Sequence, residues 1–346
     1  MSLEFHVYGP GFGETIFLRW SGGHDNWRGA LVDAHSNRDG QWLADKLREL
    51  GLAELDFVVA THPHLDHIRN LAAGLKRSSI RVQRVLYWPP FNDSTWFRFY
   101  DRLAAQEGGH LSETAEMIHQ WFGYLKTEEQ ANGLVTRGVE GLSDFSNTVS
   151  CQIQGAPLKI TVIGPWNTIN CRLCKNIANS SKRNRTIDYE HRYGNDVSIA
   201  LLLEYGSAQV VLGGDMEETN WAALTREIGR PRFKPSFIKV SHHGSENGRI
   251  DGMWKQFAGF FGGKGMDAVA VVTPWRQAGC RLPNGDLVLD EIRKAGFLVY
   301  VTAQGEHGYC NEDSHVSVLV YPDGATIVTD HSPDVRKVWP TRMATM

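Results

Sequence analysis

A cluster of histidines and an aspartate stands out near position 60. Four potential metal ligands fall within six residues: His62, His64, Asp66 and His67. An apolar stretch, Leu55–Ala60, precedes them and predicts a buried strand that ends beside the first ligand. Side chains two residues apart on an extended chain point the same way, so His62 and His64 are expected to face one cation. Imidazole and carboxylate ligands suit zinc, manganese or iron.

The alternative to a metal site is a polar loop that holds three histidines by chance. Only 14 of the 346 residues are histidine, so this spacing is improbable by chance. The metal site is therefore the favoured interpretation.

The motif His62-x-His64-x-Asp66-His67 resembles the signature of the metallo-β-lactamase superfamily. The resemblance implies that the first two histidines bind one metal, and that Asp66 and His67 bind a second. Gly213-Gly214-Asp215 resembles the later motif of that family in which an aspartate bridges both metals. The resemblance thus implies a hydrolase with two divalent metal ions, Zn²⁺ or Mn²⁺.

Two further motifs match the family in the expected order. Val240–Ser245 reads VSHHGS and resembles the final motif, in which a histidine at a strand end completes the second metal site. Alignment on Gly244 favours His243 as the ligand, which leaves His242 behind it or as a proton donor. Leu31-Val32-Asp33 resembles an early motif whose aspartate orients a metal-bound histidine.

One position departs from the common family pattern. Many members have a third histidine for the first metal, about twenty residues before the bridging aspartate; here Asn195 and Asp196 stand at that place, and His191 is near. We assign Asp196 as a metal ligand and Asn195 as a substrate contact. Which of Asn195, Asp196 and His191 completes the first metal site stays open. A carboxylate there favours manganese or magnesium, or a weakly held first metal.

Within the superfamily, the chain is most similar to the hydrolase domain of the ComEC family of DNA-uptake proteins. Three segments carry this likeness: Lys239–Ser245, Asn195–Leu201 and Gly296–Thr302. The likeness implies hydrolysis of a phosphodiester, with DNA as the substrate. A metal-activated water would attack the phosphorus atom, and His242 would protonate the leaving oxygen. Asp66 would bind a metal, and Asp33 would orient a histidine ligand.

A basic stretch, Arg172–Arg192, runs directly into Asn195. It carries six lysines and arginines against one aspartate and one glutamate. Such a run suits a phosphate backbone, although charge runs are often plain solvated loops. We predict that substrate contacts come from this run and from the final motif: Lys182, Arg183, Arg185 and Ser245.

Aromatic residues gather at Trp96–Tyr100 and Trp121–Tyr124. They suit either a lid that stacks bases or a hydrophobic core, and their helical spacing favours the core. Cys171-x-x-Cys174 is a weak metal signal without a second pair, so we interpret it as ordinary thiols.

Bulk properties fit a cytoplasmic enzyme. The formal charge is −3, apolar residues make up 42% of the chain, and the five cysteines do not form a disulfide framework. The sequence has no apolar run long enough for a membrane span and no signal-peptide pattern at its start.

Strands and helices in two similar runs predict an α/β fold: an αββα sandwich of two mixed sheets, as one domain over residues 1–346, with a helical insertion at about 90–145. Strands are expected early at Leu3–Tyr8, Thr15–Trp20 and Ala30–Val32, and late at His315–Tyr321 and Ala325–Thr329. Two alternatives to a DNA nuclease stay open. One is hydrolysis of a small phosphodiester (a phosphocholine or cyclic nucleotide), an ester or a lactone; the other is a non-catalytic binding module.

Overall fold

The computed structural model describes twelve stretches of the chain: residues 2–21, 27–36, 39–88, 113–139, 148–153, 156–166, 194–228, 233–257, 268–277, 280–283, 286–303 and 312–338. The chain divides into two compact units. Unit 1 comprises residues 1–14, 145–163 and 200–346, and unit 2 comprises residues 15–144 and 164–199. That the whole chain forms one domain stays a prediction.

Unit 2 contains a mixed sheet that ends at the histidine motif. Its strand order is β2 (Thr15–Ser21), β3 (Trp27–Val32), β4 (Leu52–Ala60), β6 (Arg84–Tyr87) and β7 (Val135–Gly138), and β5 (Arg81–Val82) also pairs with β4. β2 and β3, both expected as strands, pair antiparallel, and the remaining pairs are parallel. β4 lies in the middle of this sheet, which explains its nearly continuous buried run.

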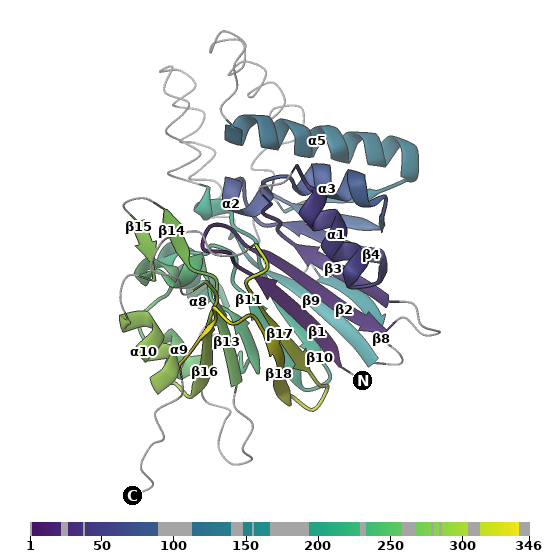
Figure 1. Ribbon diagram of the computed structural model, residues 1–346. Coiled ribbons are helices and arrows are strands. Elements are labelled where there is room, and N and C mark those ends of the chain that lie inside the picture. Colours follow the sequence, from purple (N-terminus) through teal and green to yellow (C-terminus); the bar gives the residue numbers. More distant parts are fainter. Residues whose placement is uncertain are drawn as a thin grey trace, which may run out of the picture. The chain divides into compact units, whose positions relative to one another are not determined.

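Helices cover the sheet of unit 2 (Figure 1). They are α1 (Gln41–Glu49), α2 (Leu65–Ile68), α3 (Leu71–Ser78) and α5 (Glu113–Asn132). α1 packs on α3, and α5 packs on both α3 and α2. Trp42, Leu43 and Leu47 form the buried side of α1, at the helical spacing read from the sequence.

The segment expected as an insertion, about 90–145, is described at 113–139. It holds α5 and then β7, a strand that the sequence did not predict; its half-exposed, partly polar residues leave no apolar alternation to detect. Trp121 is 1% exposed, and Phe122 packs edge-on against Tyr87 at 5.7 Å between ring centroids. The core interpretation is therefore confirmed for Trp121 and Phe122, while Trp96–Tyr100 lies outside the described residues.

Unit 1 is built on a second mixed sheet of eight strands. The order is β19 (Arg336–Val338), β16 (Phe297–Val301), β13 (Ala268–Val272), β12 (Phe237–Lys239), β11 (Ala208–Leu212), β10 (Ala200–Tyr205), β9 (Ala156–Gly164) and β8 (Thr148–Ile153). Neighbours from β11 to β16 are parallel. The ends of β11, β12 and β13 therefore meet at one edge of the sheet, where polar residues follow each strand.

Two layers cover the eight-stranded sheet of unit 1. An antiparallel group, β18 (Thr326–His331), β17 (His315–Val320) and β1 (Leu3–Tyr8), includes the expected C-terminal hairpin and packs on the sheet, with Phe5 4.9 Å from Phe237 between ring centroids. Helices α8 (Glu218–Ile228), α9 (Met253–Phe257) and α10 (Leu287–Lys294) also belong to unit 1. Trp254 of α9 packs on Phe297. The strand register places Phe297 and Phe237 on opposite faces of the sheet, so α9 covers the face away from β1.

The fold class expected from the sequence, α/β with two mixed sheets, is confirmed. No helix among the described residues is long and apolar enough to cross a membrane.

Candidate metal centre

The histidine cluster of unit 2, defined as His62, His64, Asp66 and His67, comes directly after β4. The strand ends at Ala60, and α2 begins at Leu65 with His64 as its N-cap. His62 and His67 are fully buried and Asp66 is nearly so, whereas His64 is half-buried. A central strand thus delivers four ligand-type side chains to one turn at its end.

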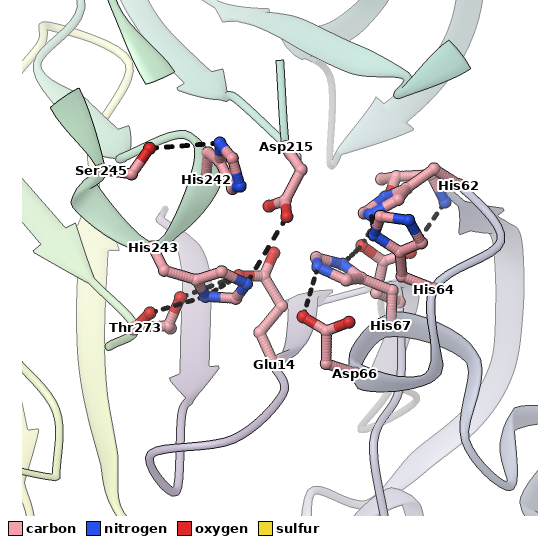
Figure 2. Close-up of polar contacts among 12 residues, drawn as sticks. Glu14, His62, His64, Asp66, His67, Asp215, His242, His243, Ser245 and Thr273 are labelled. Carbon is pink, nitrogen blue, oxygen red and sulfur yellow. Dashed lines mark hydrogen bonds and ion pairs between the residues drawn. The ribbon is translucent and has the colours of Figure 1, made fainter. Parts of the chain in front are cut away.

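The imidazole nitrogens of this cluster converge (Figure 2). His62 Nε2 lies 3.1 Å from His64 Nδ1, and His67 Nε2 lies 3.2 Å from an Asp66 carboxylate oxygen. The rings of His62 and His67 are 4.1 Å apart between centroids. Two imidazole nitrogens at 3.1 Å need a proton or a cation between them, because both otherwise present lone pairs.

Asp33 lies behind His67 and holds its ring. The Asp33 Oδ2 atom accepts hydrogen bonds from His67 Nδ1 at 2.7 Å and from the Thr61 hydroxyl at 2.7 Å, while Oδ1 accepts one from the Thr61 backbone N–H. The Asp33 backbone is left-handed, with φ 56°, a conformation that costs about 1–3 kcal/mol for a residue other than glycine. With Nδ1 donating to Asp33, the lone pair of His67 is on Nε2.

Replacing Asp33 by Asn is expected to weaken metal binding about 10–100-fold, the usual effect of removing the partner of a ligating histidine. A competition titration of the folded protein against a chelator measures this affinity. Asp45→Asn on the surface of α1 is the control, because Asp45 is partly exposed and bonds to Gln41 and Arg48 of the same helix. An unchanged affinity in a folded Asp33→Asn variant contradicts the role given to Asp33.

His35 is a buried histidine that sequence reasoning missed. Its burial lowers its pKa from 6.5 to about 3, against the opposing effect of the Asp66 charge. The folded protein therefore keeps His35 neutral, whereas the unfolded chain takes up a proton below about pH 6.5. This stability is fully present above pH 6.5 and is lost as the pH falls toward 3.

We expect His35→Gln to flatten the acid dependence of stability. Urea midpoints measured at pH 7 and at pH 4.5 should differ less in the variant than in the parent protein, because this proton uptake by the unfolded chain is gone. Equal differences in the two proteins would show that His35 does not contribute.

The segment expected to complete the first metal site lies beside the end of β4. Asn195–Val197 forms one short 3-10 turn, and the Ile199 N–H donates to the Thr61 carbonyl at 3.0 Å. Asp196 is 8% exposed. The backbone therefore brings Asn195 and Asp196 next to the histidine cluster within unit 2. The alternative ligand His191 and the predicted substrate contacts Lys182, Arg183 and Arg185 lie outside the described residues.

Unit 1 carries its own ligand-type group, the acidic–histidine cluster of Glu14, Asp215 and His243. All three are buried, and each offers a ligand atom within 4.8 Å of the others. Asp215 follows β11 through a glycine turn. A Cβ on Gly213 would overlap the Ser241 hydroxyl, and Gly214 has φ 51°, a conformation that glycine adopts without strain.

His243 is held from behind by a backbone carbonyl (Figure 2). Its Nδ1 donates to the Thr273 carbonyl oxygen at 2.8 Å, and its Nε2 lies 3.5 Å from an Asp215 carboxylate oxygen. His242 and His243 both have positive φ, 48° and 54°. Two successive left-handed residues other than glycine are strained, and such strain concentrates at functional sites.

His242 has different surroundings. Its side chain is 16% exposed, and its Nδ1 lies 3.1 Å from the Ser245 hydroxyl and 3.5 Å from Glu217. The Ser245 hydroxyl donates to the Asn247 side chain, so it accepts from His242 Nδ1. Ser245, predicted to contact the substrate, thus holds His242. His243 has the surroundings of a ligand and His242 those of a more exposed acid or base.

The buried ion pair of Glu14 and Lys239 was not predicted from the sequence. Both side chains are almost completely buried; Lys239 Nζ donates to Glu14 Oε2, and so does the Thr273 hydroxyl at 2.8 Å. Contacts therefore run from Lys239 through Glu14 and Thr273 to the His243 ring. A lysine at the end of the apolar strand β12 and a glutamate just before β2 were the only signals in the sequence.

Comparison with known proteins agrees with the motif interpretation of unit 2. Residues 27–129 match the model of the Metallo-beta-lactamase superfamily, a range that includes β3, β4 and the histidine cluster. This part of the chain is therefore similar to that superfamily. No curated protein shows significant similarity to the sequence.

The solved structures to which this chain is similar are distant. The E377D mutant of CmlA beta-hydroxylase is 14% identical, with a TM-score of 0.34, over 69% of this chain and 35% of that one. MIM-2 metallo-beta-lactamase is 12% identical, with a TM-score of 0.30, over 61% and 57%. Zn²⁺-bound PqqB from Methylobacterium extorquens is 10% identical, with a TM-score of 0.35, over 78% and 88%. This chain spans little more than a third of CmlA and just over half of MIM-2, and similarity at this level says nothing about substrate.

Proposed function

We propose that this protein is a metal-dependent hydrolase of the metallo-β-lactamase superfamily, whose model its residues 27–129 match. It would bind two divalent cations; the histidine cluster of unit 2 and the acidic–histidine cluster of unit 1 each offer ligand-type side chains. One observation carries the proposal: His67 and His243 each donate Nδ1–H to a fixed oxygen acceptor and turn Nε2 toward a carboxylate. This is how metal-ligating histidines are held in proteins.

The donor set fits Zn²⁺ or Mn²⁺, since imidazoles and carboxylates are ligands for both. Such cations supply Lewis acidity and lower the pKa of a bound water. The protein's own groups orient the histidine rings and move protons. Asp33 keeps the His67 ring in one tautomer, and the Thr273 carbonyl does the same for His243. His242, more exposed than either, can protonate a leaving oxygen when it is imidazolium.

For the substrate we propose a phosphodiester, and DNA in particular. The support comes from the ComEC-like segments and from the basic run Arg172–Arg192, which leads into Asn195 and Asp196. Attack on a phosphodiester builds negative charge at phosphorus, and a basic run that binds the backbone would hold the strand in place.

Elemental analysis of the purified protein, followed by a cleavage assay with manganese or zinc on single- and double-stranded DNA, tests this function. A triple charge reversal, Lys182→Glu with Arg183→Glu and Arg185→Glu, should abolish DNA cleavage yet spare hydrolysis of a nitrophenyl phosphodiester. Full metal occupancy without cleavage of any DNA would contradict the nuclease proposal and leave the hydrolase proposal standing.

The formal charge of −3 favours a second candidate, because the molecule as a whole has no field to attract a polyanion. That candidate is hydrolysis of a small phosphodiester, an ester or a lactone by the same residues. Equal loss of both activities in the charge-reversed variant, or activity on lactones alone, would support it. A protein that binds no metal and is unaffected by Asp66→Ala would instead be a non-catalytic module.

A further inference from the structure

A cavity of about 370 Å³ lies in unit 1, between α9 with the residues just before it and α10. Its walls include Arg249 and Trp254 on one side and Glu291 and Lys294 on the other. α9 and α10 both pack on β16, α9 through Trp254 on Phe297 (Figure 1). None of its lining residues belongs to the histidine cluster or to the acidic–histidine cluster.

Arg249 sits deep in this cavity with its two terminal nitrogens already engaged. One lies 3.1 Å from a Glu291 oxygen and the other 3.4 Å from an Asp251 oxygen, and the side chain is only 11% exposed. Its Nε is buried and has no acceptor among the residues that the structure describes. The same holds for the indole Nε1 of Trp254, whose residue is 4% exposed. Both atoms are enclosed by the surrounding protein, so what the cavity offers to a ligand is its charge.

Two lysines add unbalanced positive charge. Lys255 and Lys294 line the same cavity, are exposed, and make no ion pair with any described residue. Three cationic side chains thus face two carboxylates, both of which already contact Arg249. The cavity therefore offers a net positive charge.

We propose that this cavity binds a small phosphate-bearing molecule, up to the size of a mononucleotide. Its volume lies within the ~300–1,000 Å³ typical of ligand pockets. A guanidinium and ammonium groups are the side chains that recognise phosphate in proteins. The inference rests on the cavity and its charges, and it holds whether or not the proposed hydrolase activity is correct.

Titration calorimetry of the full-length protein with inorganic phosphate, adenosine monophosphate and citrate tests the proposal. We expect saturable binding of one phosphate or one mononucleotide per chain, weakened at least about tenfold in the double variant Lys255→Glu with Lys294→Glu, as expected for losing one or more charge-assisted hydrogen bonds. Both lysines are exposed, so this variant should fold. The matched control is Lys76→Glu with Lys126→Glu, which makes the same charge change on exposed residues of α3 and α5.

Arg249→Lys is a second variant, because it keeps the positive charge but replaces the planar guanidinium with a point charge; it should also weaken binding. Absence of saturable binding overturns the proposal, and so does equal loss in the control, which would indicate general charge attraction. Phosphate binding that survives the Lys255 and Lys294 reversals would belong to the metal ligands and overturns it too. Binding of citrate alone overturns the assignment to phosphate.

Discussion

Glu14→Gln and Lys239→Met, made singly, are each expected to destabilise the protein by about 3–5 kcal/mol, because each leaves a charged or polar partner buried and unpaired. Glu14 is 1% exposed and Lys239 is fully buried, so water cannot replace the missing partner. The double variant should recover much of this loss, since two neutral groups of similar size remain in the same space.

Urea unfolding of the parent, both single variants and the double variant completes the cycle. The exposed pair Lys159 and Glu204, 2.9 Å apart, is the control, and its variants should change stability by no more than about 1 kcal/mol. Additive losses in the double variant, or single losses as small as those of the control pair, would contradict a buried ion pair. Because Glu14 also holds the Thr273 hydroxyl, the single variants should loosen His243 as well.

Asp215→Asn is expected to lower metal-dependent hydrolysis by ~10³-fold or more, the equivalent of several kcal/mol of transition-state stabilisation. The amide has nearly the same size as the carboxylate, so the turn after β11 should keep its shape. It lacks the negative charge that faces His243 Nε2 at 3.5 Å. The loss should therefore fall on metal binding and rate rather than on folding.

Metal content and kcat on a nitrophenyl phosphodiester, measured together, check this prediction. Asp330→Asn, at an exposed carboxylate of β18, is the control and should leave both unchanged. His242→Gln separates metal binding from catalysis, because this variant should keep the metals while reducing kcat. Full activity of a folded Asp215→Asn variant would contradict the two-metal proposal.

Local patterns in the sequence were enough to predict where the chemistry begins. The apolar run Leu55–Ala60 ends as a strand at Ala60, directly before His62, because burial on both faces of a central strand requires continuous apolar residues. Asp33 also meets a histidine of the motif, as the resemblance implied. The apolar pattern therefore determines the strand, and the spacing of the motif determines which ligand-type side chains gather at its end.

Contacts between residues far apart in the chain were decided only by the tertiary structure. Glu14 and Lys239 are separated by 225 positions, and no periodic pattern records that their side chains share one buried space. The same is true of the left-handed backbone at Asp33 and His242, whose N–H groups donate to the carbonyls of Val59 and Gly214. Sequence periodicity reports which face of an element is buried, but only packing determines which buried partner a charged group meets.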